Sequence, residues 1–285
     1  MQNDYPKISC LCVTRNRVEY LKASIECFRN QSYPNKELVI VYVADDHATA
    51  QFARELDDGD IRVVEVPVEA RTSLGAVRNI AIEQATGQYI CNWDDDDWFH
   101  QDRLKIQYEA IIQSRKRASI LYYLIIFDRL ENTAYTTNCR QWENSIMCEK
   151  QVLVEHGIKY PALELGEDTV FVEGLREANV LFPIIRPQLY IYNYTGMNTC
   201  DQSHFETMFG YGKKMSEAHS ALVAQAVSGE LDCKGASAIL DSEDFMGAIH
   251  YDGFRPWRSQ ALALVQAHAQ GQADAAAQAP LAFGS

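Results

Sequence analysis

Short apolar runs alternate with amphipathic segments along the first part of the chain. The apolar runs predict buried strands at residues 8–13, 37–43, 61–66 and 89–93. Leu21, Ile25 and Phe28 recur at helical spacing, and a second helix is predicted over 74–85, closed by Gly87. Strands that alternate with helices indicate an α/β fold, with a mostly parallel, Rossmann-like sheet flanked by helices.

The pattern becomes less regular further along. The apolar run 118–128 predicts one more strand, and 129–165 shows no clear period. Three further elements are predicted: a helix from 166 to about 178, a strand pair within 180–194 and a helix over about 205–227. Ala and Gln dominate from Ser259 onward, which is typical of a tail without its own core. The chain thus divides into 1–128, 129–227 and a C-terminal extension, 228–285.

Charge and composition narrow the class of protein. The chain has 26 Lys and Arg against 39 Asp and Glu, a net charge of −13, which argues against a nucleic-acid partner. Its longest apolar run, 118–127, is shorter than the roughly 20 residues of a transmembrane helix. The N-terminus lacks a secretory pattern, so we expect a cytoplasmic protein, with peripheral membrane attachment as an alternative, and eight free cysteines.

Polar clusters follow the predicted strands at 14–17, 45–47 and 94–97. The carboxyl ends of parallel strands meet at one sheet edge, where ligands bind in such folds. Asp94 to Asp97 are four consecutive acids that would repel one another without a cation. Mn²⁺ or Mg²⁺ is a suitable cation, because it binds one or two carboxylates together with the phosphates of a substrate. A solvated acidic turn is the alternative, but the preceding apolar strand and the flanking Trp93 and Trp98 favour a metal site.

Other charged residues have two interpretations each. Arg71 and Arg78 either hold a diphosphate or balance the aspartates, with Arg78 favoured for the site. The pair Asp45-Asp46 either belongs to the site or caps a helix. Asp168 is either a general base or an acid placed in the first turn of a helix.

Four segments together carry a family resemblance: ISCLCVTRNR, NQSYPNKELVIVYVADDHAT, SLGAVRNIAIEQATGQYICNWDDDDW and GEDTVF. In this order they resemble the motifs of family 2 glycosyltransferases, which have the GT-A fold. The resemblance implies inverting transfer of a sugar from a nucleotide diphosphate sugar, with UDP-sugars favoured and a divalent metal held by a DxD element. It makes 1–128 the nucleotide-sugar half and 129–227 the acceptor half, for a glycan, lipid-linked or small-molecule acceptor.

The resemblance also implies roles for individual residues. Asp96 resembles the metal ligand and Asp168 the catalytic base, with Glu167 as the next candidate, while Asp97 is expected to start a helix and face away from the ion. YIYNYTGMNTC resembles an HGxNT segment, with Thr195 in place of its histidine. His204 is therefore a candidate metal ligand, or else a helix-start residue. The donor-binding residues implied by position are Thr14, Arg15, Asp46, Arg78, Asp94 and Asp95.

Two other classes stay open. A nucleotidyltransferase also places acids beside a nucleotide, but it usually has a glycine-rich signature where this chain has VTRNRVEY. A non-catalytic module for sugar nucleotides or carbohydrates would bind the ligand without metal-stimulated turnover. Trp98 occupies the position where a haloacid-dehalogenase phosphatase has Thr or Val, and neither a P-loop nor a GxGxxG turn is present.

Overall fold

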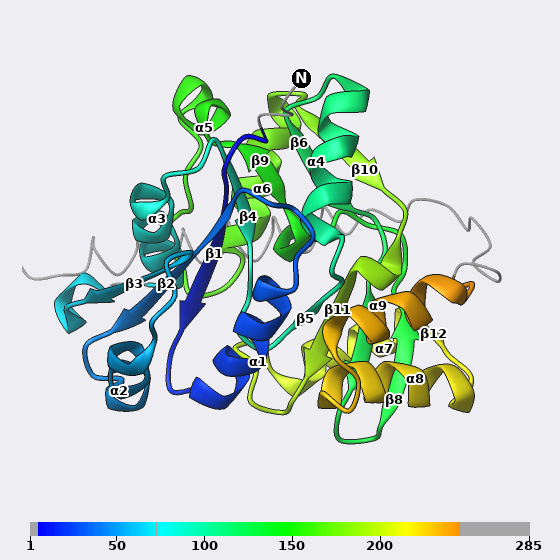
Figure 1. Cartoon of the computed structure of the whole chain (residues 1–285). Helices are drawn as coiled ribbons and strands as arrows, with labels where there is room; N and C mark the ends of the chain where they lie inside the picture. The colour runs from blue at the N-terminus through cyan, green and yellow to red at the C-terminus, as the bar shows by residue number, and fades with distance from the viewer. Residues whose placement is uncertain (1–4, 72, 246–285) are drawn as a thin grey trace, which may run out of the picture. The chain divides into compact units, whose positions relative to one another are not determined.

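The computed structural model describes residues 5–71 and 73–245, and its centre is a seven-stranded sheet in the order β10-β6-β9-β4-β1-β2-β3 (Figure 1). β9 runs antiparallel to β4 and β6, and the other neighbouring pairs are parallel. The expected mostly parallel α/β sheet is therefore confirmed. The strands are β1 (Ile8–Thr14), β2 (Lys36–Val43), β3 (Ile61–Val66), β4 (Tyr89–Asn92), β6 (Ala118–Leu121), β9 (Met147–Glu149) and β10 (Leu181–Ile184).

Side-chain alternation along β1 divides the core between the two faces of this sheet. Ile8, Cys10 and Cys12 pack in the cluster that contains α1 (Val18–Arg29) and α4 (Arg103–Ser114). Leu11 points to the opposite face, in the cluster formed with α3 (Leu74–Gln84), α5 (Lys150–His156) and α6 (Glu167–Glu177). Helices thus cover both faces, which is why the strands read as continuous apolar runs.

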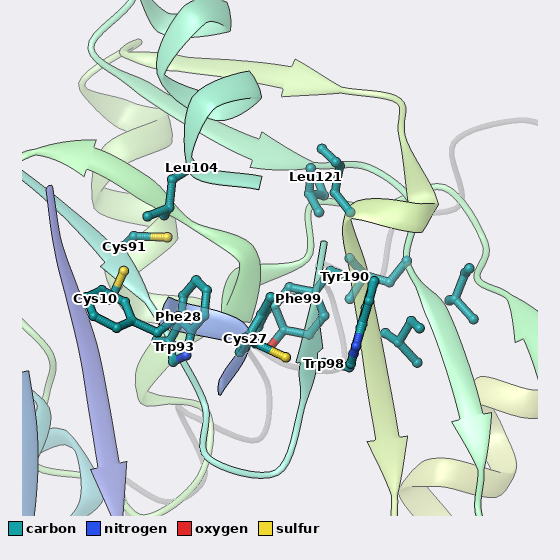
Figure 2. Packing of buried hydrophobic residues seen from close by; sticks show 14 of the residues in the cluster. Cys10, Cys27, Phe28, Cys91, Trp93, Trp98, Phe99, Leu104, Leu121 and Tyr190 are labelled. Atoms are coloured by element: carbon teal, nitrogen blue, oxygen red, sulfur yellow. The ribbon is translucent and has the colours of Figure 1, made fainter. Parts of the chain in front are cut away.

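A smaller sheet extends the first core. Its order is β12-β8-β7-β11-β5, and Phe99 and Tyr190 from it pack with Phe28 and Trp93 beneath the large sheet (Figure 2). Because one apolar cluster serves both sheets, they share a core. The strands are β5 (Trp98–Phe99), β7 (Ile125–Asp128), β8 (Thr133–Thr136), β11 (Tyr190–Tyr194) and β12 (Lys213–Lys214).

Three predictions of secondary structure were wrong. The run 118–128 forms β6 and β7, in different sheets, because Tyr122 N bonds to Ile184 O and Leu124 N to the hydroxyl of Thr137. β10 and β11, within 180–194, likewise do not pair with each other. The helix expected over 205–227 is interrupted by β12, which separates α7 (Gln202–Tyr211) from α8 (Glu217–Ser228). Ser216 caps α8 through the N–H of His219.

The expected division at residue 128 does not separate the two sheets, since β9 and β10 lie in the large one. Among the described residues, helices α2 (His47–Glu55) and α9 (Cys233–Ser242) complete the fold, and no helix is long and apolar enough to cross a membrane. All eight cysteines are free, as expected. The Ala/Gln-rich tail lies outside the described residues.

Candidate active site

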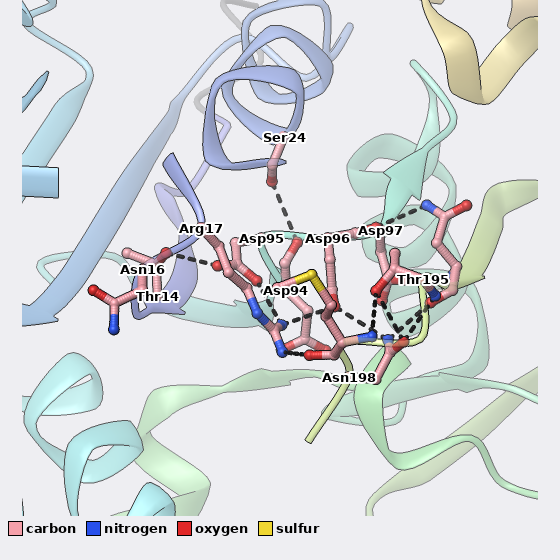
Figure 3. Close-up of polar contacts among 12 residues, drawn as sticks. Thr14, Asn16, Arg17, Ser24, Asp94, Asp95, Asp96, Asp97, Thr195 and Asn198 are labelled. Carbon is pink, nitrogen blue, oxygen red and sulfur yellow. Dashed lines mark hydrogen bonds and ion pairs between the residues drawn. The ribbon is translucent and has the colours of Figure 1, made fainter. Parts of the chain in front are cut away.

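The loop between β1 and α1 contacts the acids of two neighbouring strand ends, and Figure 3 shows its contact with the acids after β4. Asn16 has a left-handed backbone with φ of 55°, a conformation that asparagine tolerates better than most residues. Its N–H donates to Oδ2 of Asp46 over 2.6 Å, and the hydroxyl of Thr14 donates to Oδ2 of Asp95 over 2.6 Å. The loop therefore joins the acids after β2 to those after β4.

Asp46 is fully buried and is the N-cap of α2. Its oxygens accept bonds from the N–H and hydroxyl of Thr49 at 3.0 and 2.7 Å, as well as from Asn16. Burial opposes the charged form, but these bonds outweigh it and lower the pKa of Asp46. Arg15, also predicted to bind the donor, pairs at 2.6 Å with the exposed Asp45. The helix-cap interpretation of this acidic pair thus holds for Asp46.

The four consecutive aspartates differ in their surroundings. Asp94 keeps 20% of its side chain exposed, against 8% for the Asp96 side chain. Asp97 is buried, accepting from the hydroxyl of Tyr190 at 2.5 Å and from the N–H of Asn193 at 2.9 Å. The expectation that Asp97 starts a helix was wrong: β5 follows it, and its carboxylate joins β11 to the acidic segment.

Burial and mutual repulsion raise the pKa values of Asp95, Asp96 and Asp97. The pKa of Asp95 rises to about 6 and that of Asp96 to about 7, in each case mainly because burial disfavours the charged form. The pKa of Asp97 is also raised, by burial and then by Asp96. Neighbouring charges from Arg17 act in the opposite direction on Asp95 and Asp96 without cancelling these effects. Burial therefore disfavours the charged forms of these acids, and a cation bound beside them would favour those forms.

A fully buried arginine supports the acidic segment from below. Arg103 packs beside the adjoining rings of Phe99 and Tyr190, with its guanidinium carbon 4.6 and 4.8 Å from their centres. Its Nη2 donates to the carbonyl of Asn92, the last residue of β4. Among the described residues its Nη1 is one of three buried side-chain polar atoms with no hydrogen-bond partner. Sequence reasoning missed Arg103, since nothing in a helical pattern marks an arginine as buried.

The segment 195–198, called here the TGMN loop, directly follows β11 and contacts Asp96. Nδ2 of Asn198 lies 3.2 Å from Oδ2 of Asp96, and Oδ1 of Asn198 accepts from the N–H and hydroxyl of Thr195. In this chain an asparagine, not a histidine, makes the contact from the HGxNT-like segment. The resemblance directed attention to position 195, and Asn198 was missed.

Arg78 connects the acidic segment to α6. Its Nη2 lies 3.2 Å from Asp94 Oδ1, and its Nε lies 3.0 Å from Glu167 Oε1. Burial opposes the charged form of Arg78, but Asp94 and Glu167 outweigh it and raise its pKa. The structure thus shows Arg78 balancing an aspartate, and its contact with a diphosphate stays a prediction. Arg71 instead pairs with Glu164 through two contacts of 3.0 and 3.2 Å.

Asp168 follows Glu167 in the first turn of α6. Gly166 precedes the helix with φ of 77°, which glycine adopts without strain. Asp168 is partly buried, and its Oδ1 accepts from the N–H of Thr169 over 2.8 Å. Burial, followed by the charges of Glu167 and Glu143, raises the pKa of Asp168 to about 7. A carboxyl group with this pKa is suited to proton transfer near neutral pH.

His204 lies in the first turn of α7, where Asp201 caps the helix by accepting from the N–H of His204. Its pKa is lowered by burial and by Arg140, against weaker opposing effects of Asp201 and Glu143. Among the described residues, the structure therefore groups His204 with Arg140 and Glu143. Glu143 is also one of the charges that raise the pKa of Asp168.

A different group, His100, Asp102 and Asp241, has ligand atoms within 4.8 Å of one another and could hold a metal ion. Here both ring nitrogens of His100 already have partners. Nδ1 accepts from the N–H of Asp102 at 3.0 Å, so Nε2 carries the proton, 3.2 Å from Ser237 O and 3.3 Å from Asp241 Oδ2. These contacts attach α9 to the segment before α4.

Comparisons with known proteins agree with this architecture. Residues 9–159 match the family model for glycosyl transferase family 2. Glycosyltransferase GlyA of Streptococcus pneumoniae is 28% identical over 107 residues, which cover 38% of this chain and 15% of that protein. The putative Bacillus subtilis glycosyltransferase EpsH is 36% identical over 97 residues, or 34% and 28% of the two chains. The matched segments therefore span well under half of these relatives.

Solved structures share the fold. S. aureus TarS 1-349 in complex with UDP-GlcNAc has a TM-score of 0.57 at 18% identity, covering 78% of this chain and 71% of that one. Mannosyltransferase PcManGT from Pyrobaculum calidifontis, in complex with GDP-Man and Mn²⁺, has a TM-score of 0.53 at 15% identity, covering 94% and 81%. With a family match over more than half of its length, the chain belongs to glycosyl transferase family 2.

Proposed function

We propose that this protein is an inverting glycosyltransferase that moves a sugar from a nucleotide diphosphate sugar to an acceptor hydroxyl. The observation that carries the proposal is the bridge made by Arg78. It joins Asp94, in the acidic segment, to Glu167, and thereby sets Asp168 beside the same edge of the sheet. A donor-side acidic cluster and a separate carboxyl group suited to act as a base are the two parts that inverting transfer requires.

The acidic segment fits a divalent ion. Its donors are carboxylate oxygens, the ligands that Mg²⁺ and Mn²⁺ prefer, and a dication beside Asp95 and Asp96 would offset the burial that disfavours their charged forms. Asp96 would hold the ion, with Asp94 and Asp95 beside it. Such an ion supplies Lewis-acid stabilisation to the departing diphosphate. The mannosyltransferase with the same fold was solved with Mn²⁺ and GDP-Man, which supports this assignment.

The donor lies, in this proposal, over the β1–α1 loop. Thr14 and Asn16 hold that loop against Asp95 and Asp46, so they shape the nucleotide site from below. Arg15, on the exposed side, is within the same loop and pairs with Asp45. UDP is the favoured nucleotide, and the TarS complexes with UDP and UDP-GlcNAc support it.

Asp168 acts as the base. It takes the proton of the acceptor hydroxyl as the acceptor oxygen bonds to the anomeric carbon. The bond from that carbon to the phosphate oxygen breaks, and its electrons leave with the diphosphate. Glu167 is the next candidate, but its ion pair with Arg78 engages it. The acceptor is a glycan, a lipid-linked sugar or a small molecule, bound on the side formed by residues 129–227.

Turnover separates this function from its alternatives. The protein is incubated with Mn²⁺ and a panel of UDP- and GDP-sugars, and release of the nucleoside diphosphate is measured, first with water and then with sugar acceptors. We expect metal-stimulated release that Asp96→Asn abolishes. Binding without any release would favour the non-catalytic module. A parallel incubation with a nucleoside triphosphate and a sugar phosphate tests the nucleotidyltransferase, which release of pyrophosphate would favour.

A further inference from the structure

Arg17 contacts the acid that we propose as the metal ligand. Its Nη1 lies 2.8 Å from Oδ2 of Asp96 and 3.5 Å from Oδ1 of Asp95. Its Nη2 donates to the carbonyl of Met197 over 2.5 Å. The guanidinium therefore lies between the acidic segment and the TGMN loop, as Figure 3 shows.

The acids, not the helix, account for this position. Arg17 is the N-cap residue of α1, and the partial positive charge at a helix N-terminus disfavours a cation there. Its side chain is only 19% exposed, so much of the charge has left water. Asp96 and Asp95 compensate for both costs, and they do so with the carboxylates that a divalent ion would use.

We propose that Arg17 is an exchangeable counter-ion, which competes with the divalent metal for Asp96 and is released when the metal binds. The inference rests on the metal assignment in the proposed function. A guanidinium and a dication beside one carboxylate repel each other, and the dication neutralises the cluster more completely. Without the metal, Arg17 thus neutralises part of the charge of Asp96 and Asp95. Its competition sets the metal concentration at which the ion binds.

The exchange also affects the TGMN loop. Two of its contacts depend on Oδ2 of Asp96: Asn198 donates to that oxygen directly, and Arg17 connects it to Met197 O. A metal at this oxygen removes both contacts. Binding of the ion therefore loosens the loop, while Nδ2 of Asn198 keeps its bond to Asn193 O over 2.9 Å. Metal entry is thus coupled to the mobility of the loop beside Asp96.

The sign of one affinity change tests the proposal. Mn²⁺ binding is titrated without nucleotide, by calorimetry and by the EPR signal of the free ion, on the full chain. Removing the competing charge in Arg17→Gln should tighten Mn²⁺ binding by at least about tenfold. Arg17→Lys keeps the charge and should stay near wild type. Arg29→Gln is the matched control, because it removes the same charge from the other end of α1, where Arg29 pairs with Glu26 and Asp58.

Damage to the fold would weaken Mn²⁺ binding, so tighter binding cannot come from misfolding. Equal or weaker binding by Arg17→Gln overturns the competition. Faster hydrogen exchange at the amides of Thr195 and Met197 when Mn²⁺ is added supports release of the loop, and unchanged exchange overturns it. If none of the variants binds Mn²⁺, with or without UDP, the metal assignment itself is wrong, which is a different result.

Discussion

Nε of Arg78 lies 3.0 Å from Oε1 of Glu167, and this ion pair distinguishes two adjacent acids. Glu167 is buried and pairs with the arginine, although burial still raises its pKa, and the pKa of Asp168, the next residue, is raised to about 7. Arg78 also pairs with Asp94, so the arginine connects the donor-side acids to α6.

Asp168→Asn should leave UDP affinity and melting temperature near wild type while kcat falls by roughly 10² to 10⁴, the usual contribution of a general base. The reason is that a base acts on the acceptor hydroxyl only in the transition state. One preparation is measured for UDP affinity, melting temperature and turnover. Early melting or loss of UDP binding would make Asp168 structural, and full turnover would move the base to another residue.

The pH dependence of turnover should report Asp168. Because its pKa is raised to about 7 and the ionised form is the base, kcat should rise as pH increases through that value. Glu143 is one of the charges that raise this pKa, so Glu143→Gln should lower it and shift the rising limb to lower pH. The profile of Asp168→Asn serves as the control. A limb that stays in place in Glu143→Gln would contradict the assignment.

Asp96→Asn and Asp97→Asn should fail in different ways. At pH 8 the ionised form of Asp96 is disfavoured by burial, so Asp96→Asn should melt at or above the wild-type temperature while losing metal-dependent UDP binding. Both carboxylate oxygens of Asp97 accept hydrogen bonds, from the Tyr190 hydroxyl and the Asn193 N–H. Asparagine replaces one of these oxygens with an NH₂ donor, so Asp97→Asn should lose about 1–3 kcal/mol of stability. Greater loss of UDP binding in Asp97→Asn would place the metal one residue later.

Arg78→Met should destabilise the fold by about 3–5 kcal/mol, because it leaves the carboxylates of Glu167 and Asp94 without their cation. Glu167→Gln in the same background should recover part of that loss, since the buried negative charge is then removed. Denaturant unfolding of the two single variants and the double variant gives the coupling energy. Additive effects would show that the bridge contributes nothing as a pair.

The sequence predicted β1 to β4 and the acids at their ends, because the apolar runs of β1, β2 and β4 are buried on both faces and each polar cluster directly follows a strand. It did not predict β9, which lies in the irregular stretch 129–165. Patterning did not predict the break between β6 and β7, since both halves are equally apolar and the break depends on distant partners such as Thr137. Nor did it identify Arg103 or Asn198, whose partners lie far along the chain. Residues that act through long-range contacts have no local signature.

We propose that a divalent metal on Asp96 binds the nucleotide diphosphate of the donor. Calorimetric titration of UDP into the wild-type protein, once in EDTA and once in saturating Mn²⁺, tests it most directly, with GDP as the comparison nucleotide and Asp96→Asn as the matched variant. We expect strong binding of UDP only with Mn²⁺, and none by Asp96→Asn under either condition. Equal affinity of the wild type in EDTA and in Mn²⁺ would contradict it.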